Sequence, residues 1–232
     1  RRTARRSRKE RKIGEAEKAG AICNAGGCYY LMDERDAAGE VVGQWLGDGR
    51  SAYPLVGLPV MDLENICAMF DITEKKREKL IMREMDAPDT MNWEDAAPLE
   101  RQLDDPKLCV RYDGRDLLPL ETTAGVTFIQ EKYLLPLDGL EYMRLYERRG
   151  RNGDLFYIVA KIGMMIQAVI MPMDLPDKDF MEALNDLTSQ CRDAMRKKAL
   201  IPKQESVPER ETGPLFQVDA STGEVVGEGV GE

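Results

Sequence analysis

The strongest constraint on the fold of this chain is a short pattern that it contains twice. Residues 47–55 read GDGRSAYPL and residues 112–120 read YDGRDLLPL, so Asp-Gly-Arg is followed by three variable residues and Pro-Leu in both. An Asp-Gly pair between apolar, β-prone segments predicts a tight hairpin turn, because glycine accepts a positive φ. Each copy therefore predicts two antiparallel strands, joined at Asp48-Gly49 in the first and at Asp113-Gly114 in the second.

The similarity between the two copies continues downstream of the turn. The segments ICAMFDI and KLIMREM follow the first copy, and the segments KYLLPL and YMRLYER follow the second. Read as strands, these segments give each copy four strands. We therefore predict an α+β, β-rich fold with two similar antiparallel β modules, related by internal duplication. Coincidence is the alternative, because Asp-Gly turns and Pro-Leu steps are both common.

The expected globular region spans residues 21–198. Module one covers about residues 38–85, and module two, with a further hairpin and a helix, covers residues 107–198. Between them, residues 86–106 contain seven acids, one base and three prolines, which predicts an acidic connector with a short helix at residues 92–103. Residues 164–172 are apolar on both faces of a strand, which predicts a position in the middle of a sheet.

Residues 177–198 predict an amphipathic helix. Its apolar residues recur at spacings of three and four and form one stripe: Phe180, Leu184, Leu187, Cys191 and Ala194 or Met195. Acids at its start and bases at its end suit the helix dipole. We expect this C-terminal helix to pack on the sheet. Residues 199–232 are acidic and contain many Gly and Pro, which predicts a disordered tail.

The N-terminus is a basic arm, residues 1–20, expected to be flexible or to form a short helix without a clear apolar face. Its first twelve residues carry eight bases against one acid, in a chain whose net charge is −9. Such a block of charge is typical of an interaction arm, although a solvated terminus is the simpler alternative. The candidate binding residues for nucleic acid or another anionic partner are Arg1, Arg2, Arg5, Arg6, Arg8, Lys9, Arg11 and Lys12.

The absence of histidine limits the possible chemistry. Without it, Ser-His-Asp and Cys-His nucleophile systems and two-histidine zinc hydrolases are excluded. Five scattered cysteines argue against a disulfide framework, and Cys23 and Cys28 lack two further ligands for zinc, so we expect no metal and no cofactor. With no signal-peptide core at the N-terminus, we expect a cytoplasmic protein. The apolar run at residues 155–173 contains Lys161, Gly163, Gln167 and Pro172, so no membrane segment is expected.

These observations favour a non-catalytic interaction or scaffold protein that contacts a protein or nucleic acid through the basic arm. An alternative is a Mg²⁺-dependent phosphodiesterase. Gln130 and Lys132 are expected to alternate onto one face of a strand, and with Asp113 or Asp116 they resemble the metal-binding core of some restriction-type nucleases. Gln130 stands where those nucleases usually have Glu. A second alternative is a self-assembling subunit, a homo-oligomer formed through a sheet edge or a Met-rich surface.

Overall fold

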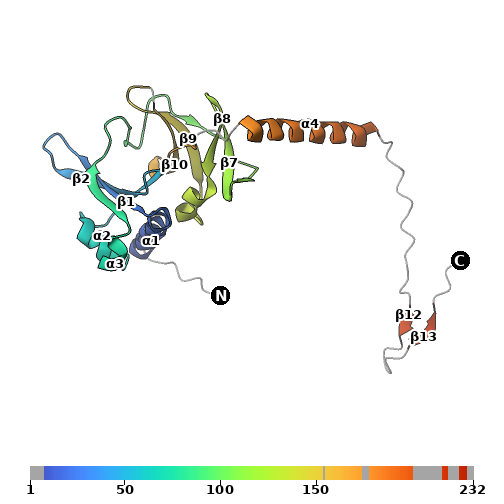
Figure 1. The fold of residues 1–232 in the computed structure, drawn as a ribbon, viewed down its shortest axis with the longest axis horizontal. Helices are drawn as coiled ribbons and strands as arrows, with labels where there is room; N and C mark the ends of the chain where they lie inside the picture. Colours follow the sequence, from blue (N-terminus) through green and yellow to red (C-terminus); the bar gives the residue numbers. More distant parts are fainter. Residues whose placement is uncertain (1–7, 154, 174–177, 201–215, 219–224, 229–232) are drawn as a thin grey trace. The chain divides into compact units, whose positions relative to one another are not determined.

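The computed structural model describes residues 8–153, 155–173, 178–200, 216–218 and 225–228 (Figure 1). The chain divides into two compact units, Arg1–Leu175 and Pro176–Glu232. The described residues combine helices with a larger share of strands, so the expected α+β, β-rich class is confirmed.

An eight-stranded sheet forms the centre of the first unit, with the strand order β4-β1-β2-β3-β11-β10-β9-β5. Its strands are β1 (Cys28–Arg35), β2 (Val41–Gly47), β3 (Ser51–Pro54), β4 (Ile81–Asp86), β5 (Arg101–Gln102), β9 (Met143–Arg149), β10 (Phe156–Ile162) and β11 (Met165–Ile170). β4 pairs in parallel with β1, and the other neighbouring strands are antiparallel.

Two three-stranded meanders, β1–β2–β3 and β9–β10–β11, meet in the middle of this sheet. They meet between β3 and β11, which pair only at Ala52↔Val169 and Ser51↔Ile170. We call this junction the seam. The expected central position of residues 164–172 is confirmed, because β11 lies between β3 and β10 and most of its side chains are buried.

One face of the sheet is covered by α1 (Arg8–Gly26), η1 (Glu131–Leu137) and a separate three-stranded sheet of β6 (Val110–Tyr112), β7 (Arg115–Thr122) and β8 (Gly125–Gln130). Ile158, Ala160, Ala168 and Ile170 point to this side, and Val159, Ile166 and Val169 belong to a second core on the other side. The central hairpin is therefore apolar on both faces because it is covered on both faces.

The helix α1 does have an apolar face, contrary to the sequence-based expectation. Ala16, Ala19, Ile22 and Cys23 are buried against the sheet and its helical cover. Most of these residues are small, so the stripe carries little hydrophobicity while allowing close approach. At Gly20 a Cβ atom would lie 2.3 Å from the ring of Phe70, which shows how closely the chain packs here.

The prediction of a third strand in each module is wrong. ICAMFDI lies largely in the helix α2 (Leu63–Met69), which precedes α3 (Glu74–Arg77), and KYLLPL lies in the 3₁₀ helix η1. The N-terminus of α2 is fixed by Asp62, whose carboxylate accepts a hydrogen bond from the Asn65 backbone N at 2.8 Å. This cap and the short apolar run after it favour a helix over a strand.

The two Asp-Gly turns also differ, and an internal duplication is not confirmed. At the second turn, Asp113 and Gly114 both have positive φ, 48° and 70°, as a type I′ hairpin turn requires. At the first turn only Gly49 has positive φ, and the Asp48 carboxylate accepts hydrogen bonds from the backbone N of Arg50 and Ser51. The first hairpin belongs to the large sheet and the second to the small one.

The acidic connector is part of the folded core. Residues 87–100, which we call the strap, follow β4 and lead into β5, and the expected helix at residues 92–103 is wrong. Met91 and Trp93 of the strap are buried in the second core, where the ring of Trp93 lies 4.8 Å from that of Trp45. The strap thus covers the face of the sheet opposite α1.

The second unit contains α4 (Lys178–Leu200) and the pair β12 (Phe216–Val218) and β13 (Val225–Glu228). A C-terminal helix is therefore confirmed. Its packing on the sheet of the first unit stays a prediction. Residues 201–215, 219–224 and 229–232 of the expected tail lie outside the described residues. Among the described residues, no helix is long and apolar enough to cross a bilayer.

Candidate functional site

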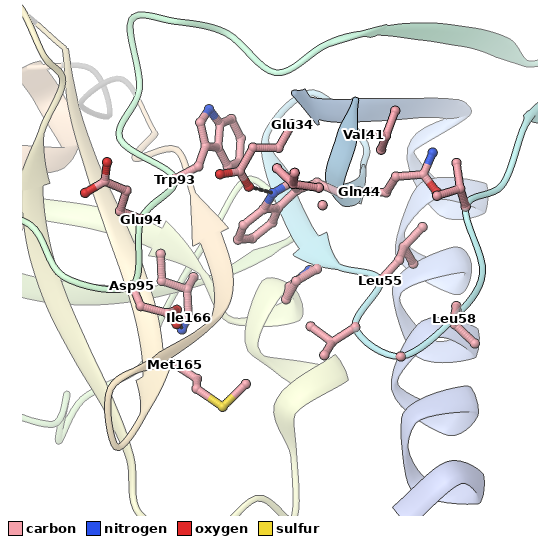
Figure 2. Close-up of a pocket in the computed structure, with 17 residues that line it drawn as sticks. Glu34, Val41, Gln44, Leu55, Leu58, Trp93, Glu94, Asp95, Met165 and Ile166 are labelled. Carbon is pink, nitrogen blue, oxygen red and sulfur yellow. Dashed lines mark hydrogen bonds between the residues drawn. The ribbon is translucent and has the colours of Figure 1, made fainter. Parts of the chain in front are cut away.

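A groove of about 440 Å³ lies where the strap passes over the first unit's sheet (Figure 2). Its walls are β2, the loop that follows β3, the strap and the start of β11. Four apolar side chains that line it are exposed to solvent, with exposed fractions from 42% to 66%: Val42, Val56, Val60 and Met165. We call this hollow the Trp groove.

The floor of the Trp groove contains both tryptophans of the chain. Trp45 and Trp93 are 5% and 7% exposed, and their rings are tilted by 53° to each other. The indole N–H of Trp45 donates to Glu34 at 3.4 Å, and that of Trp93 donates to the Pro88 carbonyl at 3.1 Å. With both rings packed and both indole nitrogens hydrogen-bonded, the floor is rigid.

One wall of the groove is held by the buried amide of Gln44. Its Nε2 donates to Asp33 and to the Met61 carbonyl, both at 2.8 Å, and its Oε1 accepts from the Met61 backbone N at 2.7 Å. The backbone N of Leu55 also donates to the Gln44 carbonyl at 2.8 Å. The loop after β3 is therefore fastened at both of its ends, which keeps the groove open between this loop and the strap.

Three carboxylates line the groove, those of Glu34, Glu94 and Asp95 (Figure 2). Asp95 accepts a hydrogen bond from the backbone N of Ile166 at 2.8 Å, near the start of β11. Within the described part of the chain, every buried side-chain nitrogen or oxygen has a hydrogen-bond partner. The groove thus combines exposed apolar side chains with negative charge.

A buried charge cluster behind the strap holds this acidic wall in place. The Glu100 carboxylate contacts Lys161 Nζ at 2.6 Å and Arg148 Nη2 at 2.7 Å. Arg148 also donates to the carbonyls of Glu94 and Asp95, at 2.7 and 2.8 Å. Burial acts to raise the pKa of Glu100, but hydrogen bonds from Lys161 and Arg148 outweigh it and leave this pKa below its ordinary value.

A second, more apolar hollow of about 360 Å³ lies on the same side of the sheet and shares Trp93 with the Trp groove. Four methionines line it: Met32, Met85, Met91 and Met171. Met32 and Met91 are buried, while Met85 is 41% exposed. The buried methionines therefore fill the core, whereas the more exposed ones form a deformable surface beside the groove.

The three residues of the nuclease-like hypothesis fall in three different elements. Asp113 lies in the β6–β7 turn, 3.9 Å from Arg115, and Gln130 ends β8 opposite Leu117. Lys132 lies in η1, with Nζ 4.8 Å from the centre of the Tyr133 ring. The premise that Gln130 and Lys132 alternate on one strand is wrong, because β8 ends at Gln130. The described residues contain no group of three or more His, Cys, Asp or Glu placed to hold a metal ion.

The basic arm lies mostly beyond what the structure describes. Arg1, Arg2, Arg5 and Arg6 lie outside the described residues. Arg8, Lys9, Arg11 and Lys12 form the start of α1, and their side chains are outside the described set as well. The arm's role in binding stays a prediction.

Sequence reasoning missed the Trp groove, although the chain carries one signal for it. Met91 and Trp93 stand within an otherwise acidic, Pro-containing segment. A solvated connector does not need large apolar side chains, so these two residues indicate that the segment packs against the sheet.

Comparisons of this chain with models of known families, with curated proteins and with solved structures found no match.

Proposed function

We propose that this chain is a non-catalytic interaction protein, whose Trp groove binds a short apolar segment of a partner protein that also carries a Lys or Arg. The observation that supports this most directly is the exposure of Val42, Val56, Val60 and Met165 around one rigid hollow. Exposed apolar side chains that gather around a hollow are typical of interaction sites. A rigid aromatic floor suits such a site, because binding then orders few side chains.

The carboxylates that line the groove support the proposal that the partner carries a positive charge. Glu34, Glu94 and Asp95 line the hollow, and the buried cation Arg148 donates to the strap's carbonyls and does not line the groove. A basic residue on the partner would meet complementary charge at the rim. Glu34 and Asp95 already hold structural hydrogen bonds to Trp45 and Ile166, which favours a binding role over proton transfer.

The size of the groove favours a small anchor. A volume of about 440 Å³ lies within the range of sites that hold a small molecule or a few side chains. A partner segment would therefore insert one or two apolar side chains and rest its backbone on the rim. This is a weak, specific contact, of the kind that a scaffold protein uses.

A panel of peptides selected from a phage-displayed library tests this proposal. The enriched peptides should share one or two apolar residues next to Lys or Arg. Fluorescence anisotropy with one labelled peptide should give at least about tenfold weaker binding for Val60→Glu and for Glu94→Lys. Val126→Glu is the matched control, because Val126 is 51% exposed on β8, away from the groove. Equal binding by Val60→Glu and the wild type would refute the groove as the site.

The basic arm supplies a second proposed contact, to nucleic acid or to an acidic protein surface. Binding carried by the arm should fall steeply with salt, because phosphate contacts release counterions. The test removes residues 1–7 and changes Arg8, Lys9, Arg11 and Lys12 to Gln, which keeps the helix α1 at full length. If duplex DNA and RNA bind the full chain and this variant equally, or bind neither, nucleic acid is not the arm's partner.

A further inference from the structure

The apolar stripe of α4 has the spacing of a helix-pairing interface. From Phe180 the steps are four, three, four and three residues, through Leu184, Leu187 and Cys191 to Ala194. This spacing averages half a heptad, the repeat that keeps one narrow stripe facing another helix. Leu187 is 56% exposed and Met195, beside the stripe, is 72% exposed. Most of the stability of a helix in a protein comes from packing of its apolar face, so the stripe of this 23-residue helix needs a cover from Leu184 onward.

The charges of α4 indicate what that cover is. The first half of the helix is net acidic, with Asp179, Glu182 and Asp186 against Lys178, and the second half is net basic, with Arg192, Arg196, Lys197 and Lys198 against Asp193. A second α4 in the antiparallel direction would place each acidic half beside a basic half. The two helix dipoles would also point in opposite directions, which places the positive end of one beside the negative end of the other. A parallel pair would place halves of the same net charge side by side.

The residues that flank the stripe agree with pairing between identical helices. In heptad terms, the positions next to the stripe hold Met181, Ala183, Thr188, Gln190 and Met195, with Lys197 near the end. Like charges therefore do not face each other in the middle of the helix pair, where homodimers of charged helices are destabilised.

We propose that α4 pairs in the antiparallel direction with α4 of a second copy of this chain and makes the protein a homodimer. In this register Leu187 of one copy meets Cys191 of the other, and Leu184 meets Ala194. The two-fold axis that relates the two copies therefore crosses the helix pair at the level of Ser189. The helix is about 35 Å long at about 1.5 Å per residue, so the paired stripe has fewer than three heptads. We expect a dissociation constant on the order of micromolar, as for small interfaces.

Sedimentation equilibrium of the full chain tests the dimer. At tens of micromolar the mass should approach twice the 26.2 kDa of one chain, and dilution should return the monomer. Leu184→Glu, on the stripe, should weaken the dimer by at least about tenfold. Ser189→Glu adds the same charge on the opposite side of the helix and should leave the dissociation constant unchanged. A monomer at all concentrations, or a dimer that Leu184→Glu leaves intact, overturns the proposal.

Disulfide trapping tests the direction of the pair. In a Cys28→Ser, Cys109→Ser background, which removes the less buried thiols of the first unit, Cys191 is the one exposed cysteine among the described residues. Adding Leu187→Cys should give, under mild oxidation, a covalent dimer that joins position 187 of one copy to Cys191 of the other. Mass spectrometry of the peptides identifies the bond. A Cys191–Cys191 bond in the background protein would show a parallel pair and overturn the antiparallel assignment.

Discussion

Replacing Glu100 with Gln should lower the free energy of unfolding by about 3–5 kcal/mol, because it leaves two buried cations without their carboxylate. The side chain of Arg148 is 0% exposed and that of Lys161 is 2% exposed, while Glu100 itself is 17% exposed. The amide introduced by Glu100→Gln would accept one hydrogen bond but would carry no negative charge.

The loss of the Glu100 carboxylate does not affect the two cations equally. Arg148 keeps its hydrogen bonds to the carbonyls of Asn92, Glu94 and Asp95, whereas Lys161 keeps only the face of the Tyr146 ring, at 5.0 Å, among the contacts that the structure describes. We therefore expect Lys161 to account for most of the loss. A Glu100→Gln, Lys161→Met double variant should recover at least half of it, because a buried ion pair replaced by an apolar side chain is close to neutral.

Urea denaturation at pH 7, followed by tryptophan fluorescence, measures these changes. The fluorescence reports directly on the strap, because Trp93 belongs to it and Trp45 packs against Trp93. Glu121→Gln, an exposed carboxylate on β7, is the matched control and should change the free energy by less than about 0.5 kcal/mol. A loss below about 1 kcal/mol for Glu100→Gln would refute the reasoning, since water would then be solvating the two cations in place of the carboxylate.

The same cluster predicts a dependence on pH. The pKa of Glu100 is lower in the folded chain than its ordinary 4.5, so its contribution to stability is present above pH 4.5. This contribution is lost as the pH falls through the folded pKa. The difference in unfolding free energy between the wild type and Glu100→Gln should therefore shrink in acid, and a difference that grows in acid would contradict the assigned direction.

Three further predictions follow from particular contacts. Trp93→Ala should cost about 3–5 kcal/mol in urea unfolding, because it opens a cavity under the strap and removes the ring contact with Trp45. Asp113→Val should cost about 1–2 kcal/mol and Asp113→Asn almost nothing, because the residue has a φ of 48° that Asn tolerates and β-branched Val does not. Burial raises the pKa of Tyr29 to about 12 and also raises those of Tyr53 and Tyr133, so ultraviolet titration between pH 10 and pH 11 should leave these three of the eight tyrosines mostly un-ionised while the chain stays folded. Their stabilising contribution is present below the ordinary pKa of 10 and lost as the pH rises through the folded values, so full ionisation by pH 11 would contradict their burial.

The periodicity of the sequence predicted those elements whose buried side chains are large and apolar. The two apolar faces of residues 164–172 and the stripe of α4 were both readable, because large apolar residues repeat there with the period of a strand or a helix. The buried face of α1 was not, because Ala16, Ala19 and Cys23 are too small to mark a stripe, and their burial depends on what packs against them.

The site could not be predicted because it depends on long-range pairing. The Trp groove brings together residues 34–60, the strap at residues 93–95 and the start of β11, and only the sheet order places them side by side. The charge of the strap was equally misleading. An acidic, Pro-containing segment reads as solvated, and its burial depends on Arg148 and Lys161, which lie about fifty residues or more further along the chain.

The seam between β3 and β11 has a consequence for how the first unit opens. Its two residue pairs, with the Met171 backbone N donating to the Arg50 carbonyl at 2.7 Å, are all that the backbone of β3 shares with β11. The cohesion of the two meanders therefore comes mostly from side chains and from the strap. Amide hydrogens of β3 should exchange with solvent sooner than those of β10, so that the sheet parts along this line before either half unfolds.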